Sequence, residues 1–183
     1  MEHLKRTIMD GLEAEADAPK LARDLNISVN EAEMYTVINR NLETGNGRIS
    51  QELYDASAFD TYGYTPSDYR LMTRQSLLRH KIAYAIDIQA MKKKEQVQEL
   101  VKAANPDFAV IAKQAGGASN AQVIVGASGL VTKNNLNGGL TAAALKLKVG
   151  EISSVVKSTT GDGYYFVRLL SLATTQLSLE YIR

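Results

Sequence analysis

The 183-residue chain contains no cysteine and no tryptophan, only three prolines and only two histidines. Without cysteine it can form no disulfide bond and carries no thiolate nucleophile. No apolar run approaches the roughly 18 residues that a membrane-spanning helix needs. The first six residues, MEHLKR, are too polar for the start of a signal peptide. A net charge of +1 gives no general attraction to nucleic acid, so we expect no nucleic-acid partner.

Several catalytic and cofactor-binding patterns are also missing. The sequence has no Gly-x-Ser-x-Gly elbow, no phosphate-binding loop and no clustered His or Cys for a metal. We therefore expect no cofactor and no metal. The composition is that of an ordinary globular protein, 45% hydrophobic and 22% charged. Four dispersed aspartates are more typical of surface or capping residues than of a catalytic pair: Asp55, Asp60, Asp68 and Asp87.

The first half of the chain predicts helices. Apolar residues recur at helical spacing between positions 4 and 25. Asn30 and Glu33 form a capping-box pattern at the start of the next helix, which stops near the glycines at 45 and 47. After a short helix over 50–60, Thr65 and Pro66 start a long helix. We expect this helix, from Thr65 to Asp87, to be the longest of the fold, and its helical spacing allows an extension to about Lys94.

The second half is organised around residues 142–170. A short apolar helix ends near Gly150, where a glycine can adopt positive φ. Residues 151–157 predict a β-branched strand, 159–163 a tight turn with two glycines, and 164–170 a second strand. Gln122 to Val125 predict another short strand. We expect one core in this half, made of Phe108, Ile111, Leu145, Leu147, Ile152, Val156, Phe166, Val167 and Leu169.

This half resembles parvulin-type peptidyl-prolyl isomerase domains. The family's L-x-x-G-E-I-S and G-Y-H-I-I-K-L segments correspond to LKVGEIS from Leu147 and GYYFVRL from Gly163. Residues 107–113, DFAVIAK, resemble its D-F-x-x-L-A-K helix, and GASGLV at 126–131 is a degenerate match to its G-G-D-L-G segment. The resemblance implies an α+β fold in which a helical N-terminal domain precedes a small antiparallel sheet packed by helices.

The helical half resembles the N-terminal chaperone domain of SurA/PrsA-type foldases. The matching segments are LARDLNISVNEAEMYTVINR at 21–40 and YGYTPSDYRLMTRQSLLRHKIAYAI at 62–86. Each segment is weak evidence alone, but both stand in the family's order ahead of a parvulin-like module. We therefore expect a helical SurA-N-like chaperone domain over 1–90 and a parvulin-like, PpiC-type domain over 91–183, the latter without catalytic activity.

The resemblance also implies that the catalytic histidines are replaced. Parvulins twist an X-Pro bond in a shallow apolar cleft, beside a polar network that includes a His from the first strand and a His from the last. Tyr165 falls on the last-strand His, while His3 and His80 fall on neither position. LSLEYI at 177–182 resembles the family's first strand, V-x-x-S-H-I-L, which puts Tyr181 on the other His. We therefore expect no catalytic residues.

Two arrangements are open for residues 177–182. They either fill the central strand position that the chain leaves vacant, which would make a circularly rearranged parvulin fold, or form a hairpin with 164–170. In both arrangements, aromatic and apolar side chains around the expected cleft are candidates for binding a polypeptide: Leu130, Leu140, Tyr165, Phe166 and Tyr181.

The sequence thus predicts an extracytoplasmic protein-folding chaperone that binds unfolded or extended polypeptides. One alternative is an active peptidyl-prolyl cis-trans isomerase with a tyrosine-based network, and another is a scaffold or assembly module that binds no client. We expect a periplasmic or other cell-envelope location, with a targeting segment upstream of this sequence and more chain downstream. Any membrane contact would then run through a flanking segment, and the sequence leaves the oligomeric state open.

Overall fold

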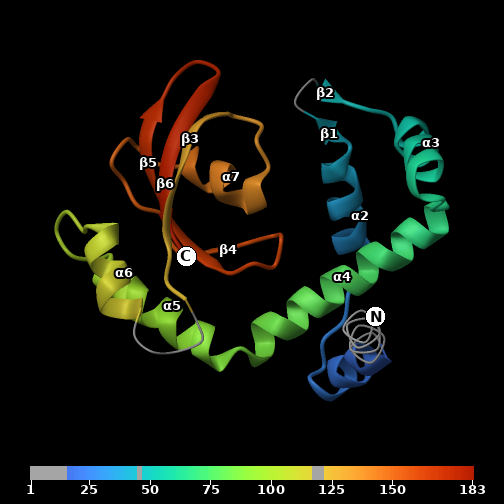
Figure 1. Ribbon diagram of the computed structural model, residues 1–183, viewed down its shortest axis with the longest axis horizontal. Coiled ribbons are helices and arrows are strands. Elements are labelled where there is room, and N and C mark those ends of the chain that lie inside the picture. The colour runs from blue at the N-terminus through green and yellow to red at the C-terminus, as the bar shows by residue number, and fades with distance from the viewer. Residues whose placement is uncertain (1–15, 45–46, 117–121) are drawn as a thin grey trace, which may run out of the picture. The chain divides into compact units, whose positions relative to one another are not determined.

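The computed structural model describes residues 16–44, 47–116 and 122–183. Helices dominate its N-terminal part and a four-stranded antiparallel sheet its C-terminal part, so the predicted α+β class is confirmed (Figure 1). The chain divides into two compact units between Ala85 and Ile86. Within the described ranges, no helix combines the length and the apolar character needed to cross a membrane.

The N-terminal unit consists of helices and one small hairpin. Residues 16–24 are helical, and the predicted helix over residues 5–15 lies outside the described residues. There follow α2 (Glu31–Asn41), β1 (Glu43–Thr44), β2 (Gly47–Arg48), α3 (Gln51–Tyr62) and α4 (Pro66–Ile86). The predicted capping box at the start of α2 is confirmed: the Glu33 amide donates to Asn30 Oδ1 at 2.9 Å, and the Asn30 amide donates to Glu33 Oε2 at 3.0 Å.

Helix α4, with 21 residues, is the longest helix in the described part of the chain. It begins where the sequence predicts, because Thr65 and Asp68 cap it reciprocally: the Asp68 amide donates to Thr65 Oγ1 and the Thr65 amide to Asp68 Oδ2. Its end at Ile86 agrees with the predicted span from Thr65 to Asp87, whereas the extension to Lys94 does not occur. The chain leaves helical geometry at Asp87, whose carboxylate accepts from the Ala90 amide at 2.8 Å and so starts a new helix.

The C-terminal unit is an antiparallel sheet with helices on both faces. Its helices are α5 (Ile88–Leu100), α6 (Phe108–Gly116) and α7 (Leu140–Ala144), and the 3₁₀ turn η1 (Asn137–Gly139) leads into α7. Its strands are β3 (Val125–Thr132), β4 (Val156–Lys157), β5 (Tyr164–Leu172) and β6 (Gln176–Ile182). They lie in the order β3-β6-β5-β4.

Strand β6 has two partners. It forms a hairpin with β5 and pairs on its other side with β3, which makes it an inner strand (Figure 1). The hairpin and the central position, which the sequence left as alternatives, therefore occur together. Consistent with this position, Leu177, Leu179 and Ile182 are completely buried.

The single core predicted for this unit is wrong, because the sheet separates two apolar clusters. Val167 and Leu169 pack toward α7 together with Leu140, whereas Phe166 packs with Phe108 of α6 on the other face. Successive side chains of a strand point to opposite faces, so the neighbours Phe166 and Val167 must enter different clusters. Of the other residues expected in the core, Leu145 is exposed.

Two predicted strands also need correction. Only Val156 and Lys157 of the predicted 151–157 strand are regular, preceded by an isolated bridge between Ile152 and Arg168. The ladder is interrupted at Ser153, whose side-chain hydroxyl, rather than a main-chain carbonyl, accepts from the Val167 amide at 3.0 Å. The strand predicted at 122–125 instead begins at Val125 and continues through the GASGLV segment.

Candidate functional site

A pocket of about 450 Å³ lies on the α7 side of the sheet. Its floor comes from β3, β5 and β6, and its walls from the loop before α7 and the turn between β4 and β5. Its apolar lining includes Val131, Leu140 and Leu179. Its polar lining comprises two amides, three hydroxyls and one carboxylate: Asn135, Asn137, Ser128, Ser158, Thr160 and Asp162. Such a mixture of apolar walls and a few polar groups is typical of binding pockets.

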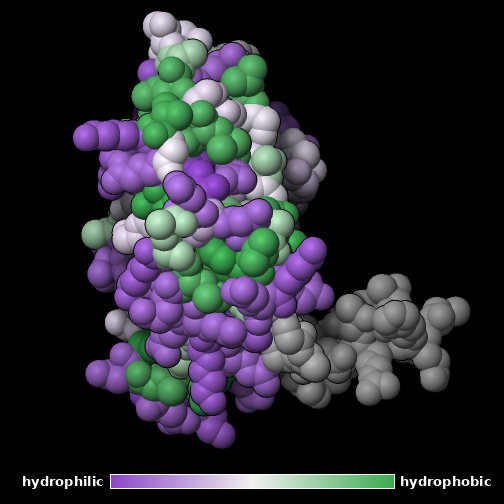
Figure 2. Space-filling view, turned by 90° about the vertical axis from the view of Figure 1, so that its left-hand side faces the viewer, coloured by the Kyte–Doolittle hydropathy of each residue, from purple (hydrophilic) through white to green (hydrophobic). Residues whose placement is uncertain are grey.

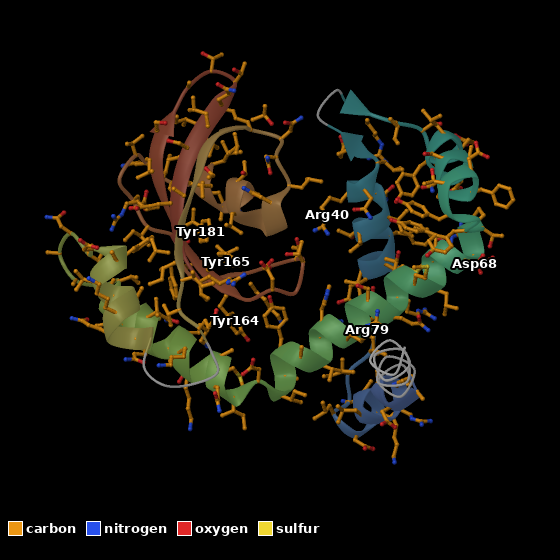
Figure 3. All side chains as sticks on the ribbon, viewed as in Figure 1. Arg40, Asp68, Arg79, Tyr164, Tyr165 and Tyr181 are labelled. Atoms are coloured by element: carbon orange, nitrogen blue, oxygen red, sulfur yellow. The ribbon has the colours of Figure 1, made fainter. Side chains whose placement is uncertain are left out.

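Two tyrosines, Tyr165 of β5 and Tyr181 of β6, form the aromatic part of the pocket (Figure 3). Their ring centroids lie 5.3 Å apart with an interplanar angle of 64°, an edge-to-face geometry that aromatic pairs favour. The preceding residue, Tyr164, lies on the opposite face, where the Lys94 ammonium is 5.7 Å from its ring centroid. The alternation of β5 therefore directs only one of its two adjacent tyrosines into the pocket.

Gly126 of β3 makes room for Tyr181. The two residues are register partners, and a Cβ atom on Gly126 would stand 2.5 Å from Cζ and Oη of the tyrosine. No ordinary contact between carbon atoms is that short. The absence of a side chain at Gly126 therefore permits the Tyr181 ring to lie close against strand β3.

Asp162 is the centre of a hydrogen-bond network at the rim. Its Oδ1 accepts from Thr160 Oγ1 at 2.7 Å, and its Oδ2 accepts from the Tyr165 hydroxyl. The Thr160 hydroxyl also lies 2.7 Å from the Ser158 hydroxyl. Arg183 Nη1 approaches Asp162 Oδ2 at 3.5 Å. These contacts fix the turn between β4 and β5 against the tyrosine ring.

The same network sets the protonation of its members. Burial alone would raise the pKa of Asp162, but hydrogen bonds from Ser158, Tyr165 and Thr160 outweigh it and lower the pKa from 3.8 to about 2. Burial, assisted by the bond to Asp162, raises the pKa of Tyr165 from 10 to about 12. At neutral pH Asp162 is therefore an anion that accepts hydrogen bonds, and Tyr165 is a protonated donor.

The wall of the pocket is held by Gly138. This residue has φ of 67°, a left-handed conformation that glycine adopts readily, and its carbonyl accepts from the Thr159 amide at 3.0 Å. A Cβ here would lie 2.6 Å from Ser158 Oγ. Gly138 thus lets the loop before α7 close against the hydroxyl-bearing turn.

Three of the five residues predicted to bind a polypeptide meet in this pocket: Leu140, Tyr165 and Tyr181. Phe166 does not, because it is buried in the cluster on the opposite face. Leu130 lines no part of the pocket and is 68% exposed on β3.

Figure 2 shows the side of the molecule that is on the left in Figure 1, where separate hydrophobic patches alternate with hydrophilic side chains.

Sequence reasoning missed the polar half of the pocket. The pattern at residues 159–163 predicts only a tight turn, although Asp162 stands three positions before Tyr165 and its carboxylate accepts from the ring hydroxyl. The signal available was a Thr-Thr-Gly-Asp-Gly run beside an aromatic strand. Within the described residues there is no group of three or more His, Cys, Asp or Glu side chains placed to hold a metal ion.

The comparison with protein families identifies a family for the C-terminal part of the chain. Residues 77–169 match the Rotamase family, described as the PPIC-type PPIASE domain, and this range is just over half of the 183-residue chain. The match starts within α4 and ends within β5, so the inner strand β6 lies outside it. No curated protein and no solved structure matches the chain.

Proposed function

The chain belongs to the PPIC-type peptidyl-prolyl isomerase family, and we propose that it acts as an extracytoplasmic chaperone whose parvulin-like domain has lost isomerase activity. In this proposal the pocket on the α7 face and the helical unit bind unfolded or extended polypeptides. The arrangement would be that of SurA/PrsA-type foldases, with a helical chaperone part ahead of the parvulin-like part. The cell envelope is the compartment that this function requires, and the absence of cysteine is compatible with it.

The observation that carries the proposal is the chemistry of the pocket. It keeps the volume and the apolar wall that would hold a polypeptide side chain, but the described residues that line it include neither His nor Cys. Its two strongly shifted groups are fixed in one state at neutral pH, since the pKa of Asp162 is about 2 and that of Tyr165 about 12. At the position where the parvulin resemblance implies a histidine, the pocket therefore holds a neutral tyrosine that donates to a carboxylate.

The surface of the helical unit supports the binding of unfolded clients. Helix α3 buries none of its residues and leaves several large apolar side chains in solvent. Leu53 and Phe59 are each 59% exposed, and Tyr62 is 70% exposed. Leu71 and Met72 at the start of α4 are exposed as well. Large exposed apolar side chains concentrated on one short segment are typical of interaction sites rather than of an inert surface.

The edge of the sheet offers a second mode of binding. Strand β3 ends the sheet, so one side of its backbone has no strand partner among the described residues. Ala127, Ser128 and Val131 of the same strand line the pocket. An extended polypeptide that adds to such an edge gains main-chain hydrogen bonds and can place alternate side chains in adjacent pockets.

An active isomerase is the second candidate. The hydrogen-bonded series of Ser158, Thr160, Asp162 and Tyr165 supports it, because a polar network beside an apolar wall is what a twisting X-Pro carbonyl needs. The third candidate, a scaffold that binds no client, predicts that the apolar surface of α3 has no effect on unfolded proteins.

The chaperone proposal is tested with an aggregation assay. The 183-residue chain is mixed with a chemically unfolded client, and light scattering is followed with and without the Phe59→Ser substitution. We expect the parent chain to slow aggregation and Phe59→Ser to weaken this effect. The control is Val149→Ser, which removes an exposed apolar side chain from the other unit. If the parent chain leaves aggregation unchanged, the scaffold alternative is favoured.

A further inference from the structure

The pocket on the α7 face contains one formal charge. Among the described residues that line it, Asp162 is the only side chain that is charged at neutral pH; the other polar groups are hydroxyls and amides. The walls beside it include Leu140 and Leu179, both buried. Apolar walls beside a charge strengthen its field inside a concave site.

The Asp162 carboxylate has one long contact that a ligand can replace. Thr160 and Tyr165 donate to its two oxygens and Ser158 also donates to it, whereas Arg183 Nη1 lies 3.5 Å from Oδ2. The side chain is 43% exposed, so an incoming group can reach it. Arg183, at 3.5 Å and itself 34% exposed, makes a long and solvated ion pair that costs little to displace.

The aromatic floor suits the same kind of ligand. Tyr165 and Tyr181 both line the pocket beside this carboxylate. Aromatic faces attract ammonium and guanidinium groups, and Lys and Arg side chains also carry an apolar stem that fits against apolar walls. A carboxylate, two tyrosines and apolar walls in one pocket thus favour a long cationic side chain over an anionic or a short neutral one.

We propose that this pocket selects client segments that carry a lysine or arginine, with Asp162 as the residue that determines this specificity. The cationic end meets the carboxylate, the stem packs against the apolar wall, and Arg183 is the internal group that the client displaces. The inference rests on the proposed binding of polypeptides at this pocket and adds the class of segment that it prefers.

The test uses the intact chain and three unstructured, fluorescently labelled peptides that differ at one position: lysine, glutamine or glutamate. We expect the lysine peptide to bind about fivefold more tightly than the glutamine peptide, as a partly exposed ion pair allows, and the glutamate peptide to bind most weakly. Raising the salt concentration should remove most of the difference between lysine and glutamine.

Two substitutions assign the effect to the pocket. Asp162→Asn should equalise the lysine and glutamine peptides, whereas Arg183→Gln should strengthen lysine binding. Glu95→Gln is the matched control, because it removes the same charge from an exposed position of α5 in the same unit, and it should preserve the preference. Circular dichroism establishes whether each variant is folded. If Asp162→Asn does not fold, the effect of Arg183→Gln on lysine binding tests the assignment to this pocket.

The possible results test the lysine preference and the binding of clients separately. Equal binding of all three peptides by the parent chain would overturn the specificity and leave the proposed client binding intact. Binding of none of them would overturn both. A lysine preference that survives in Asp162→Asn, or that Glu95→Gln abolishes, would show that another surface selects the cation and would overturn the assignment to this pocket.

Discussion

The hydroxyl of Tyr165 donates a hydrogen bond to the carboxylate of Asp162, three residues earlier in the chain. This bond joins the start of strand β5 to the loop before it. Burial raises the pKa of the tyrosine and the bond adds to this shift, while hydrogen bonds from Ser158, Tyr165 and Thr160 outweigh burial and lower the pKa of the aspartate. A tyrosine at the position where the parvulin resemblance implies a histidine is therefore held as a neutral donor. It shapes the pocket but supplies no group that titrates near neutral pH.

Removing this hydroxyl should cost stability without abolishing the pocket. Tyr165→Phe keeps the ring and its contact with Tyr181 but leaves Asp162 one donor short. We expect the free energy of unfolding to fall by about 1 kcal/mol, the usual contribution of one hydrogen bond. Urea unfolding followed by circular dichroism measures this change. An unchanged midpoint would mean that water replaces the hydroxyl without loss.

The pH dependence of the free energy of unfolding should reveal the ionisation of Asp162. Its pKa is about 2 in the folded protein against an ordinary value of 3.8. Because the folded value is the lower one, the stabilisation is fully present above about pH 4 and is lost as the pH falls through about 2. Solvent screening at this partly exposed group keeps the contribution below about 1 kcal/mol.

The measurement compares the parent chain with Asp162→Asn by urea unfolding at several pH values between 6 and 2. The parent should be the more stable of the two near neutral pH, and the difference should shrink toward zero between about pH 4 and 2. A difference that stays constant across this range would show that the carboxylate charge contributes nothing to folding.

Gly126 should tolerate no side chain. In Gly126→Ala the new methyl group would lie 2.5 Å from the Tyr181 ring, so the ring or strand β3 must move, at a cost of about 1–3 kcal/mol. The Tyr165–Tyr181 contact should be disturbed as well. Gly116→Ala is the control: a Cβ at that helical position meets no atom within 4 Å, and alanine favours a helix. Equal stability of the two variants would contradict the placement of Tyr181.

Phe108 should be essential to the cluster on the other face of the sheet. It is 2% exposed, and the Arg168 guanidinium lies 4.6 Å from its ring centroid. We expect Phe108→Ala to lower the free energy of unfolding by about 3–5 kcal/mol, the usual cost of emptying a buried aromatic site. Val110→Ala, at an exposed position of the same helix, should have little effect. A loss below about 1 kcal/mol for Phe108→Ala would contradict its burial.

Local signals in the sequence predicted local structure well. The caps at Asn30 and Thr65 are confirmed because every group that makes them lies within one helical turn. Gly150 has the predicted positive φ, 87°. The long helix ends at Ile86, in agreement with the predicted span from Thr65 to Asp87. It does not extend to Lys94, because helical spacing continues across Asp87 but an aspartate can also cap a new helix.

Contacts between segments far apart in the chain could not be predicted from the sequence. Pairing of β6 with β3 depends on which edge of the hairpin is left open, and no residue pattern within either strand specifies it. The division of Phe166 and Val167 between two clusters requires knowing that helices cover both faces of the sheet. In the pocket, the two tyrosines were found through the family resemblance, whereas Asp162 was missed because it lies in a turn.

The central claim is that this family member keeps a polypeptide-binding pocket without isomerase activity, and one measurement tests it most directly. The rate of cis/trans exchange is measured by NMR in a proline-containing peptide, with a lysine before the proline, at increasing concentrations of the intact chain. We predict an exchange rate indistinguishable from that of the peptide alone, even where changes in the peptide spectrum show that it is bound. An exchange rate well above this background that Tyr165→Phe abolishes would contradict the claim and identify an active, tyrosine-based isomerase.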